Sequence, residues 1–279
     1  MTEELDKLIT NALQEDIREG DHTSLACIPK SALGKAKLLV KENGVIAGVE
    51  VAKFIFSKVD PSIKTNVLIN DGDTIKVGDI ILEIEGPSTS ILTAERLVLN
   101  CMQRMSAIAT KTQKIKNLIS GTKAQVLDTR KTTPNFRYLE KLAVKIGGGT
   151  NHRFGLYDMM MIKDNHIDFA GGISSAIEKA NLYQKEKGIN IPIEIEARSI
   201  DEVLEILSVG NIQRIMLDNF TIEDTIKAVE LIGNKFETES SGGITEETIT
   251  QYAKCGVDFI SVGALTHSIQ SLDLSLKAI

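Results

Sequence analysis

Short apolar segments alternate with longer amphipathic segments from about residue 125 onward, and this alternation constrains the fold more than any other feature. We interpret the apolar segments 125–128, 159–163, 193–197, 214–218, 235–239 and 258–262 as strands. Helical patterns lie between them, at about 136–146, 172–187, 200–208, 222–232 and 245–255. Repeated strand-then-helix units predict an α/β fold with a parallel sheet and right-handed crossovers. Six strands are fewer than the eight of a closed (β/α)₈ barrel.

The first part of the chain has a different periodicity. Residues 3 to about 18 are predicted to form an amphipathic helix. The segments 35–40 and 45–49 are expected to be strands joined by a hairpin at Glu42-Asn43-Gly44. Further strands are predicted at 66–69, 74–77 and 79–84, separated by Asp71-Gly72 and Val77-Gly78-Asp79 turns. This pattern indicates a compact α+β module.

A long helical pattern from about 93 to 119 follows and links the two halves. We therefore predict an N-terminal α+β domain over 1–110 with its linking helix, and an α/β-barrel domain over 111–269. The tail 270–279 is expected to pack back on the first domain. The short strands and turns also fit a biotinyl or lipoyl carrier domain. A carrier needs a lysine at a tight hairpin tip, and the sequence offers no convincing candidate.

Composition narrows the class of protein. No apolar run approaches the roughly 18–20 residues that span a bilayer, so no membrane association is expected. The opening residues are acidic and lack the basic and apolar regions of a signal peptide. Cys27, Cys101 and Cys255 are widely spaced, which favours reduced thiols in a cytoplasmic protein over disulfides or a structural zinc site.

The stretch from Asp128 to His166 gathers cations, glycines and histidines in a chain that is acidic overall. Its seven Lys or Arg and four Asp or Glu give a net charge of +3, so the rest of the chain carries −9 of the total of −6. A local excess of fixed cations against a negative background indicates a small polyanionic ligand. Nucleic acid is disfavoured as a partner, because its binding usually goes with a basic domain.

Nearly every predicted strand ends in a charged residue or a glycine. In α/β barrels the reactive groups collect at the C-terminal ends of the strands. A purely structural barrel would not need charge at one rim so regularly, so the pattern predicts a site there. The residues in question are Asp128, Arg130, Lys131, Lys163, Asp164, Glu194, Glu196, Asp218, Ser241, Gly242, Gly243 and Gly263.

Several ordered motifs carry a family resemblance. The most distinctive are Asp128-Thr129-Arg130-Lys131-Thr132-Thr133-Pro134, Gly147-Gly148-Gly149-Thr150-Asn151-His152-Arg153 and Ile162-Lys163-Asp164-Asn165-His166. Further matching segments are 95–106, 194–196, 217–219, 241–244 and 261–267. In order and spacing, the chain resembles the quinolinate phosphoribosyltransferase family, also called nicotinate-nucleotide pyrophosphorylase (carboxylating), over essentially its whole length.

The resemblance implies a fold and a reaction. The family fold is an incomplete TIM-like α/β barrel with an N-terminal α+β sandwich domain, which suits the count of six strands. Its enzymes transfer phosphoribosyl from phosphoribosyl pyrophosphate to quinolinate with decarboxylation. The products are nicotinate mononucleotide, CO₂ and diphosphate, in de novo NAD biosynthesis. The resemblance also implies Mg²⁺ and a homodimer in which Arg104 reaches into the neighbouring subunit's site.

The resemblance assigns the cations of the barrel to the substrates. Arg130, His152 and Arg153 would line the dicarboxylate pocket, and Lys131 and Lys163 would lie close to the reacting groups and the diphosphate. Arginine suits planar oxyanions through paired N–H donors, and lysine supplies a point charge. The alternative for each cation is a solvated surface residue, and for His152 a core histidine.

The acidic residues are assigned to ribose and metal. Glu196 and Asp218 are the expected partners of the ribose hydroxyls and of Mg²⁺, directly or through water and diphosphate. The alternative is an ion pair with a barrel lysine. Glu194 faces the same side of its strand as Glu196, where it either assists or pairs with a cation. Arg198 departs from the family, which commonly has an acidic or amide residue there, so the electrostatics of this rim stay open.

The 5′-phosphate is assigned to glycine-rich backbone. Ser241-Gly242-Gly243 and Gly263-Ala264 resemble the phosphate site built by the last βα loops and a helix N-terminus. Thr245 is expected to cap that helix. The roles of His166 and His267 stay open.

Two rival functions remain. One is a related phosphoribosyltransferase that acts on another anionic base without decarboxylation. The other is a non-catalytic sensor that binds phosphoribosyl pyrophosphate on the same barrel and shows no turnover.

Overall fold

A computed structural model describes residues 2–279 of the chain and shows two compact units. The first unit takes in the residues up to Gln113 together with 132–148 and 264–279. The second consists of residues 114–131 and 149–263. No helix among residues 2–279 is long and apolar enough to cross a membrane.

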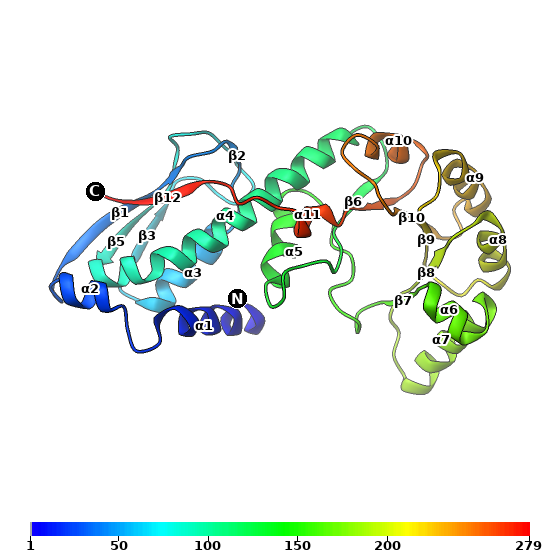
Figure 1. Cartoon of the computed structure of the whole chain (residues 1–279), viewed down its shortest axis with the longest axis horizontal. Coiled ribbons are helices and arrows are strands. Elements are labelled where there is room, and N and C mark those ends of the chain that lie inside the picture. Colours follow the sequence, from blue (N-terminus) through cyan, green and yellow to red (C-terminus); the bar gives the residue numbers. More distant parts are fainter. Residues whose placement is uncertain (1) are drawn as a thin grey trace. The chain divides into compact units, whose positions relative to one another are not determined.

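The first unit is built on a four-stranded antiparallel sheet with the order β12–β1–β5–β3 (Figure 1). Its central strands bury one face, with Leu38 in β1 and Leu82 in β5 fully enclosed. The last residues of the chain form β12, which pairs along β1 with Leu276 opposite Leu38. The strands are β1 (Leu33–Val40), β3 (Lys64–Val67), β5 (Ile80–Pro87) and β12 (Leu274–Ala278).

Helix α4 (Ser88–Leu118) is hydrogen-bonded to β12 and to the main chain at Ala47. The Gln103 side chain donates to the carbonyl of Leu274 in β12 at 2.9 Å, and the Ser106 hydroxyl accepts the Ala47 N–H at 3.0 Å. The other helices of the unit are α1 (Glu3–Ile17), α2 (His22–Cys27), α3 (Val49–Val59), α5 (Arg137–Ile146) and α11 (Ala264–His267).

The predicted hairpin at Glu42-Asn43-Gly44 is wrong. Both edges of β1 are occupied by β12 and β5, and the short β2 (Gly44–Val45) pairs with β4 (Thr74–Ile75) instead. The predicted strand 45–49 ends early because Gly48 adopts φ +100° and begins α3. These pairings join residues far apart in the sequence, so local turn signals did not reveal them.

The second unit is a parallel six-stranded sheet with the order β6–β11–β10–β9–β8–β7 (Figure 1). Within residues 2–279, β6 and β7 are edge strands that do not pair with each other, so the curved sheet is not closed. The structure therefore confirms the α/β prediction and the incomplete barrel. The strands are β6 (Gln125–Leu127), β7 (Met160–Ile162), β8 (Ile193–Ala197), β9 (Arg214–Asp218), β10 (Glu237–Ser241) and β11 (Phe259–Ser261).

Five helices follow these strands and line the outer side of the sheet (Figure 1). They are α6 (Asp164–Ala170), α7 (Ile173–Lys187), α8 (Ile200–Val209), α9 (Ile222–Ile232) and α10 (Ile249–Lys254). The prediction that Thr245 caps the last of them is wrong, because α10 begins at Ile249 with Thr248 as its N-cap. Residues 245–248 form a turn in which the Thr245 carbonyl accepts the Thr248 N–H at 3.2 Å.

Candidate active site

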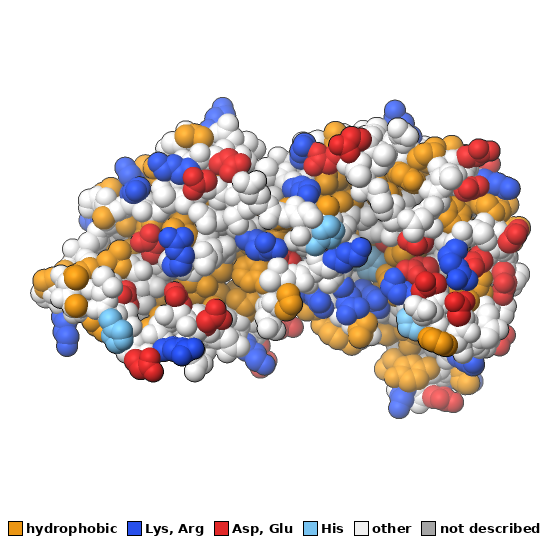
Figure 2. All heavy atoms as spheres, in the orientation of Figure 1, with side chains coloured by type: hydrophobic (Ala, Val, Ile, Leu, Met, Phe, Trp, Pro, Cys, Tyr) orange, Lys and Arg blue, Asp and Glu red, His pale blue; other side chains and the backbone are white. Residues whose placement is uncertain are grey.

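The second unit brings the predicted strand-end residues to one edge of its sheet. Because all six strands run parallel, their C-terminal ends meet at the same rim. On the face drawn in Figure 2, Lys and Arg side chains gather next to the loops that lead into β7. The rim residues from the predicted set are Arg130, Lys131, Lys163, Glu196, Asp218, Ser241, Gly242, Gly243 and Gly263.

Lys163 and Glu196 form an ion pair across the ends of β7 and β8. Glu196 Oε2 also accepts the Asp164 N–H at 3.4 Å, at the start of α6. The Glu196 carboxylate is nearly enclosed, whereas the Lys163 side chain is about half exposed. The ion pair that the sequence left as an alternative for Glu196 therefore exists, and it fixes an ammonium group at the rim.

Asp218 and the glycines after β10 form a second part of the rim. Asn219 links them, because its side-chain amide donates to Asp218 Oδ2 at 2.8 Å and its N–H donates to the Ser241 carbonyl at 2.9 Å. Gly242 has φ +94°, and a Cβ there would lie 2.2 Å from Asn219 Oδ1. Only glycine fits this position. The chain therefore places a tight, glycine-dependent loop beside the Asp218 carboxylate.

The loop that carries Arg153 is anchored by two carboxylates. Fully buried Asp128 accepts the His152 N–H at 2.8 Å and the Asn151 side-chain amide at 2.5 Å. Asp158 accepts the Phe154 N–H at 2.6 Å. Arg153 is thus held from both sides. The sequence reasoning treated Asp128 only as a strand end and missed Asp158, although an aspartate in a glycine-containing loop is a common turn anchor.

Arg153 lies in an electropositive setting. Burial, and then the neighbouring Arg130 guanidinium, lower the pKa of Arg153, while the carboxylates of Glu194, Asp158 and Glu196 oppose that shift. Two guanidinium groups close together repel each other, and an anion bound between or beside them would relieve that repulsion. The two guanidinium groups thus lie near enough to interact, and their shared role in an oxyanion pocket stays a prediction.

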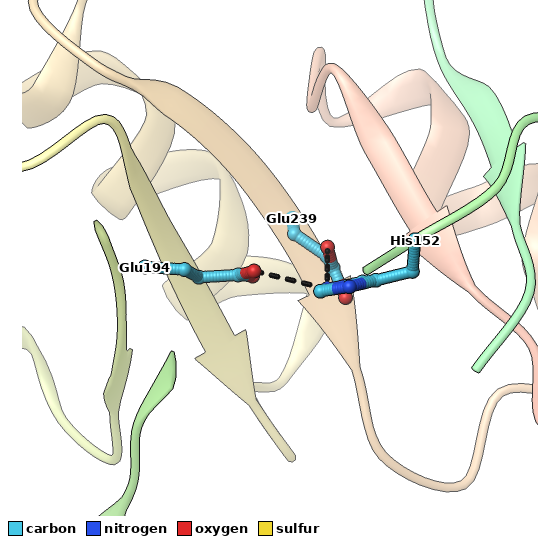
Figure 3. A group of neighbouring side chains, drawn as sticks. All are labelled: His152, Glu194 and Glu239. Atoms are coloured by element: carbon cyan, nitrogen blue, oxygen red, sulfur yellow. Dashed lines mark ion pairs between the residues drawn. The ribbon is translucent and has the colours of Figure 1, made fainter. Parts of the chain in front are cut away.

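Below the rim, His152 is enclosed between two glutamates (Figure 3). Its Nε2 lies 2.9 Å from Glu194 Oε2 and 3.4 Å from Glu239 Oε2, and all three side chains are buried. The sequence reasoning left the role of Glu194 open and missed Glu239, which lies in the middle of a strand of small polar residues. Arg214 of β9 completes the group, with Nη1 3.1 Å from Glu239 Oε2.

The protonation of this group follows from its charges. Burial lowers the pKa of His152, but the carboxylates of Glu194 and Glu239 outweigh it and raise that pKa, and both carboxylates face Nε2. Burial and the nearby Glu239 carboxylate raise the pKa of Glu194 to about 7. Nδ1 of His152 accepts the Arg153 N–H at 2.6 Å, and this contact opposes a second proton on the ring.

Arg104 lies in the first unit, where two side chains and one main-chain carbonyl of that unit hold it. Its Nε donates to Glu140 Oε1 at 2.7 Å, and its Nη2 donates to Thr133 Oγ1 and to the Thr266 carbonyl, both at 3.0 Å. Glu140 is fully buried and also accepts the Thr133 N–H at 3.1 Å. The guanidinium is therefore fixed in orientation. Glu140 was missed in the sequence because it lies in a helical pattern.

The structure shows contacts for three residues whose roles the sequence leaves open, namely His166, His267 and Arg198. Nδ1 of His166 accepts the Lys163 N–H at 2.9 Å, which caps α6. Nδ1 of His267 lies 2.7 Å from Ser268 Oγ. Arg198 is bound to Glu202 of α8, with Nη2 2.7 Å from Oε1. The added charge of Arg198 is thus balanced within its own neighbourhood.

Comparison with known proteins places these features in a family. Residues 21–106 match the N-terminal domain of quinolinate phosphoribosyl transferase, and residues 108–277 match its C-terminal domain. The chain belongs to the quinolinate phosphoribosyltransferase family. Relatives in this family include quinolinate phosphoribosyltransferase [decarboxylating] 1 of Nicotiana glauca, 45% identical over 99% of this chain and 83% of the relative.

A second relative in the quinolinate phosphoribosyltransferase family is the probable nicotinate-nucleotide pyrophosphorylase [carboxylating] of Bacillus subtilis. It is 40% identical over 98% of this chain and 93% of its own. Among solved structures, the nicotinate-nucleotide pyrophosphorylase of Francisella tularensis superposes with a TM-score of 0.92 at 39% identity, covering 99% of this chain and 96% of that one. The family assignment therefore rests on both domains.

Proposed function

We propose that this chain transfers phosphoribosyl from phosphoribosyl pyrophosphate to quinolinate and releases CO₂, which gives nicotinate mononucleotide and diphosphate for de novo NAD biosynthesis. The observation that carries the proposal is the rim of the barrel. There, the adjacent Arg130 and Arg153 lie with the Lys163–Glu196 pair in a chain that matches both family domains.

The chemistry needs positioned charge more than a covalent nucleophile. The pyridine nitrogen attacks C1 of the ribose as diphosphate leaves, and the transition state resembles an oxocarbenium ion. Lys131 and Lys163 stabilise the departing diphosphate, and Arg130 and Arg153 hold the two carboxylates. After N-ribosylation the 2-carboxylate leaves as CO₂. The positive ring nitrogen stabilises the carbanion, which then takes a proton.

The acidic residues suit the ribose and a magnesium ion. Glu196 is opposite Met216, and Asp218 is two residues further along β9, so both acidic residues share one face of the sheet. Carboxylate oxygens are ligands of the kind that Mg²⁺ takes, with waters and substrate phosphates completing the set. When bound, Mg²⁺ would neutralise charge on the diphosphate. Glu196 and Asp218 would hold it directly or through water.

The assembly and compartment are also proposals. By its resemblance to the family, the active unit is a homodimer in which Arg104 completes the neighbour's pocket. The fixed orientation of the Arg104 guanidinium supports this role. We place the enzyme in a reducing compartment, the cytoplasm, because Cys101 and Cys255 are buried thiols and burial raises the pKa of both.

The experiment that tests the activity follows nicotinate mononucleotide and CO₂ together, from quinolinate, phosphoribosyl pyrophosphate and Mg²⁺. Equal amounts of the two products are expected, and omission of Mg²⁺ should suppress both. Nicotinate replaces quinolinate in a parallel reaction. Turnover with nicotinate alone would contradict the proposal in favour of a transferase for another base. Binding of phosphoribosyl pyrophosphate without turnover would favour a sensor.

A further inference from the structure

Four titratable side chains meet inside the barrel, away from the rim at which substrates are proposed to bind. Glu194 of β8 and Glu239 of β10 are fully buried, and Arg214 of β9 lies between their strands (Figure 3 shows the glutamates with His152). Arg214 Nη1 lies 3.1 Å from Glu239 Oε2 and 4.0 Å from Glu194 Oε2. Burying two carboxylates is costly unless they are well compensated. Nothing in the proposed reaction uses them directly.

The orientation of the His152 ring shows what the pair does. Nε2 faces both carboxylates, and Nδ1 accepts the N–H of Arg153 at 2.6 Å. Both ring nitrogens are therefore engaged within the protein, and the side chain is only 4% exposed. A carboxylate only accepts hydrogen bonds when ionised, so the pair favours a proton on Nε2. The tautomer that results leaves a lone pair on Nδ1, which is what the Arg153 N–H needs.

We infer that Glu194 and Glu239 are positioning residues, which fix the tautomer and orientation of His152 and through it the main chain of Arg153. His152 then supports the dicarboxylate pocket from below, and Arg153 contacts the substrate. The inference rests on the proposed function for its kinetic consequence. The contact between His152 Nδ1 and the Arg153 N–H lies within the protein, so it can be tested independently of activity.

The same three side chains also have the spacing of a metal site, since one ligand atom from each lies within 4.8 Å of the others. Arg214 argues against that role. Its guanidinium is in contact with Glu239 and is stacked 4.1 Å from the centre of the Phe259 ring. A cation is thus already built into the group, and the charge of the acid pair is partly compensated without metal.

The kinetic test compares Glu194→Gln and the double variant Glu194→Gln/Glu239→Gln with Glu237→Gln. Glu237 is the matched control, because it lies on β10 and binds Arg214 at 2.9 Å but has a half-exposed side chain outside the pair. We expect the KM for quinolinate to rise at least about tenfold in the double variant, because a small misplacement of a binding group is costly. The KM for phosphoribosyl pyrophosphate should stay within about twofold, since its proposed contacts lie elsewhere on the rim. An unchanged KM for quinolinate, or an equal rise in both, would overturn the inference.

Amide hydrogen exchange at Arg153, in protein without substrates, provides the readout that does not depend on activity. The Arg153 amide should exchange at least about tenfold faster in the double variant than in wild type, with no such change in Glu237→Gln. If the Arg153 amide exchanges faster in the double variant but the wild-type protein has no activity, the proposed function is wrong and the positioning role stands. Unchanged exchange would overturn the positioning role even in an active enzyme.

Two further variants separate the two ring nitrogens. His152→Asn keeps an acceptor near the Nδ1 position, whereas His152→Gln keeps a polar group near Nε2 and loses that acceptor. His152→Asn should therefore retain more affinity for quinolinate than His152→Gln, and equal losses would contradict action through Arg153.

If the variants Glu194→Gln and Glu194→Gln/Glu239→Gln do not fold, Glu194→Asp withdraws the carboxylate but keeps its charge. The same exchange measurement at Arg153 then applies. A tightly bound metal that is lost in Glu194→Gln/Glu239→Gln but retained in Glu196→Gln would overturn the assignment.

Discussion

Lys163 shows how a single side chain at the end of a strand combines a structural contact with a chemical one. Its ammonium group pairs with Glu196, and its backbone N–H is accepted by His166 Nδ1 at 2.9 Å. The main chain is therefore fixed independently of the ion pair. The ammonium group is therefore already in position to stabilise a departing diphosphate. Such a preorganised charge lowers the activation barrier, because the protein does not have to rearrange during the reaction.

Replacing Lys163 by Ala should lower kcat by about 100-fold or more, because a preorganised charge aimed at the leaving group is lost. The free energy of unfolding should fall by about 1–3 kcal/mol, because the nearly enclosed Glu196 carboxylate loses its partner. Steady-state kinetics and urea unfolding check the two quantities. Lys187→Ala, at the end of α7, is the matched control and should leave both unchanged. A kcat within about threefold of wild type would remove Lys163 from the proposed chemistry.

At the scale of the residue, sequence reasoning found the cations at the rim but not the groups that orient them. Arg130, Arg153 and Lys163 stand out because their motifs frame them at strand ends. Glu239 and Glu140 do not stand out, since their functions depend on contacts with His152 and Arg104 from distant parts of the sequence. A buried acid in the middle of a strand or helix shows no local sign of its partner.

The loop after β10 shows how one element depends on a single glycine. Gly242→Ala should raise the KM for phosphoribosyl pyrophosphate at least about tenfold, because a Cβ would lie 2.2 Å from Asn219 Oδ1 and displace the proposed phosphate loop. Gly171→Ala is the matched control, with φ +92° and no atom within 4 Å of the added Cβ. It should cost about 1–2 kcal/mol of stability from strain alone. Equal kinetics in the two variants would show that the loop does not bind substrate.

The starts of β10 and β11 are joined by Asp258. Burial raises the pKa of this carboxyl, but the ammonium of Lys123 and the hydrogen bonds from Thr238 outweigh it, so the pKa lies below its ordinary value. A carboxyl with a lowered folded-state pKa contributes stability at neutral pH, and the contribution is lost as the pH falls through that pKa.

Asp258→Asn should therefore be less stable than wild type at neutral pH, and the difference in their free energies of unfolding should become smaller on acidification. Urea unfolding over a series of pH values measures this difference. Glu186→Gln, an exposed change on α7, is the control and should give a curve parallel to that of wild type. A gap that is constant across the acid range would show that the Asp258 carboxyl is not linked to folding through its pKa.

Element by element, the repeated strands and helices of the second unit were predictable, and the pairings of the first unit were not. Except for β10, which is polar, the parallel strands carry their own apolar pattern, and β7 to β11 are successive neighbours joined by local crossovers. β12 instead pairs with β1 across most of the length of the chain, and β2 pairs with β4 rather than with its neighbour. Periodicity reports which face of a segment is buried but not which distant strand covers its edge.

At the scale of the whole molecule, the question is which subunit supplies each residue of the proposed pocket. Arg104 is held in the first unit by Glu140, whereas Lys163 and Glu196 pair in the second. If each pocket takes Arg104 from the neighbouring subunit, as the family resemblance implies, then an isolated monomer is inactive. Two variants that are each inactive should then complement each other.

We predict that Arg104→Ala and Lys163→Ala subunits, each inactive alone, recover activity when they are mixed and allowed to form hybrid dimers. In a hybrid, one pocket combines the intact Lys163 of one subunit with the intact Arg104 of the other, and the second pocket lacks both. Random mixing of two equal populations should therefore restore about a quarter of wild-type activity. The control mixes Arg104→Ala with the double variant Arg104→Ala/Lys163→Ala, which contains no intact Arg104 and should show no recovery. If mass measurement confirms hybrids and no activity returns, each pocket is built within one chain, because only a shared pocket can be rescued by exchanging subunits.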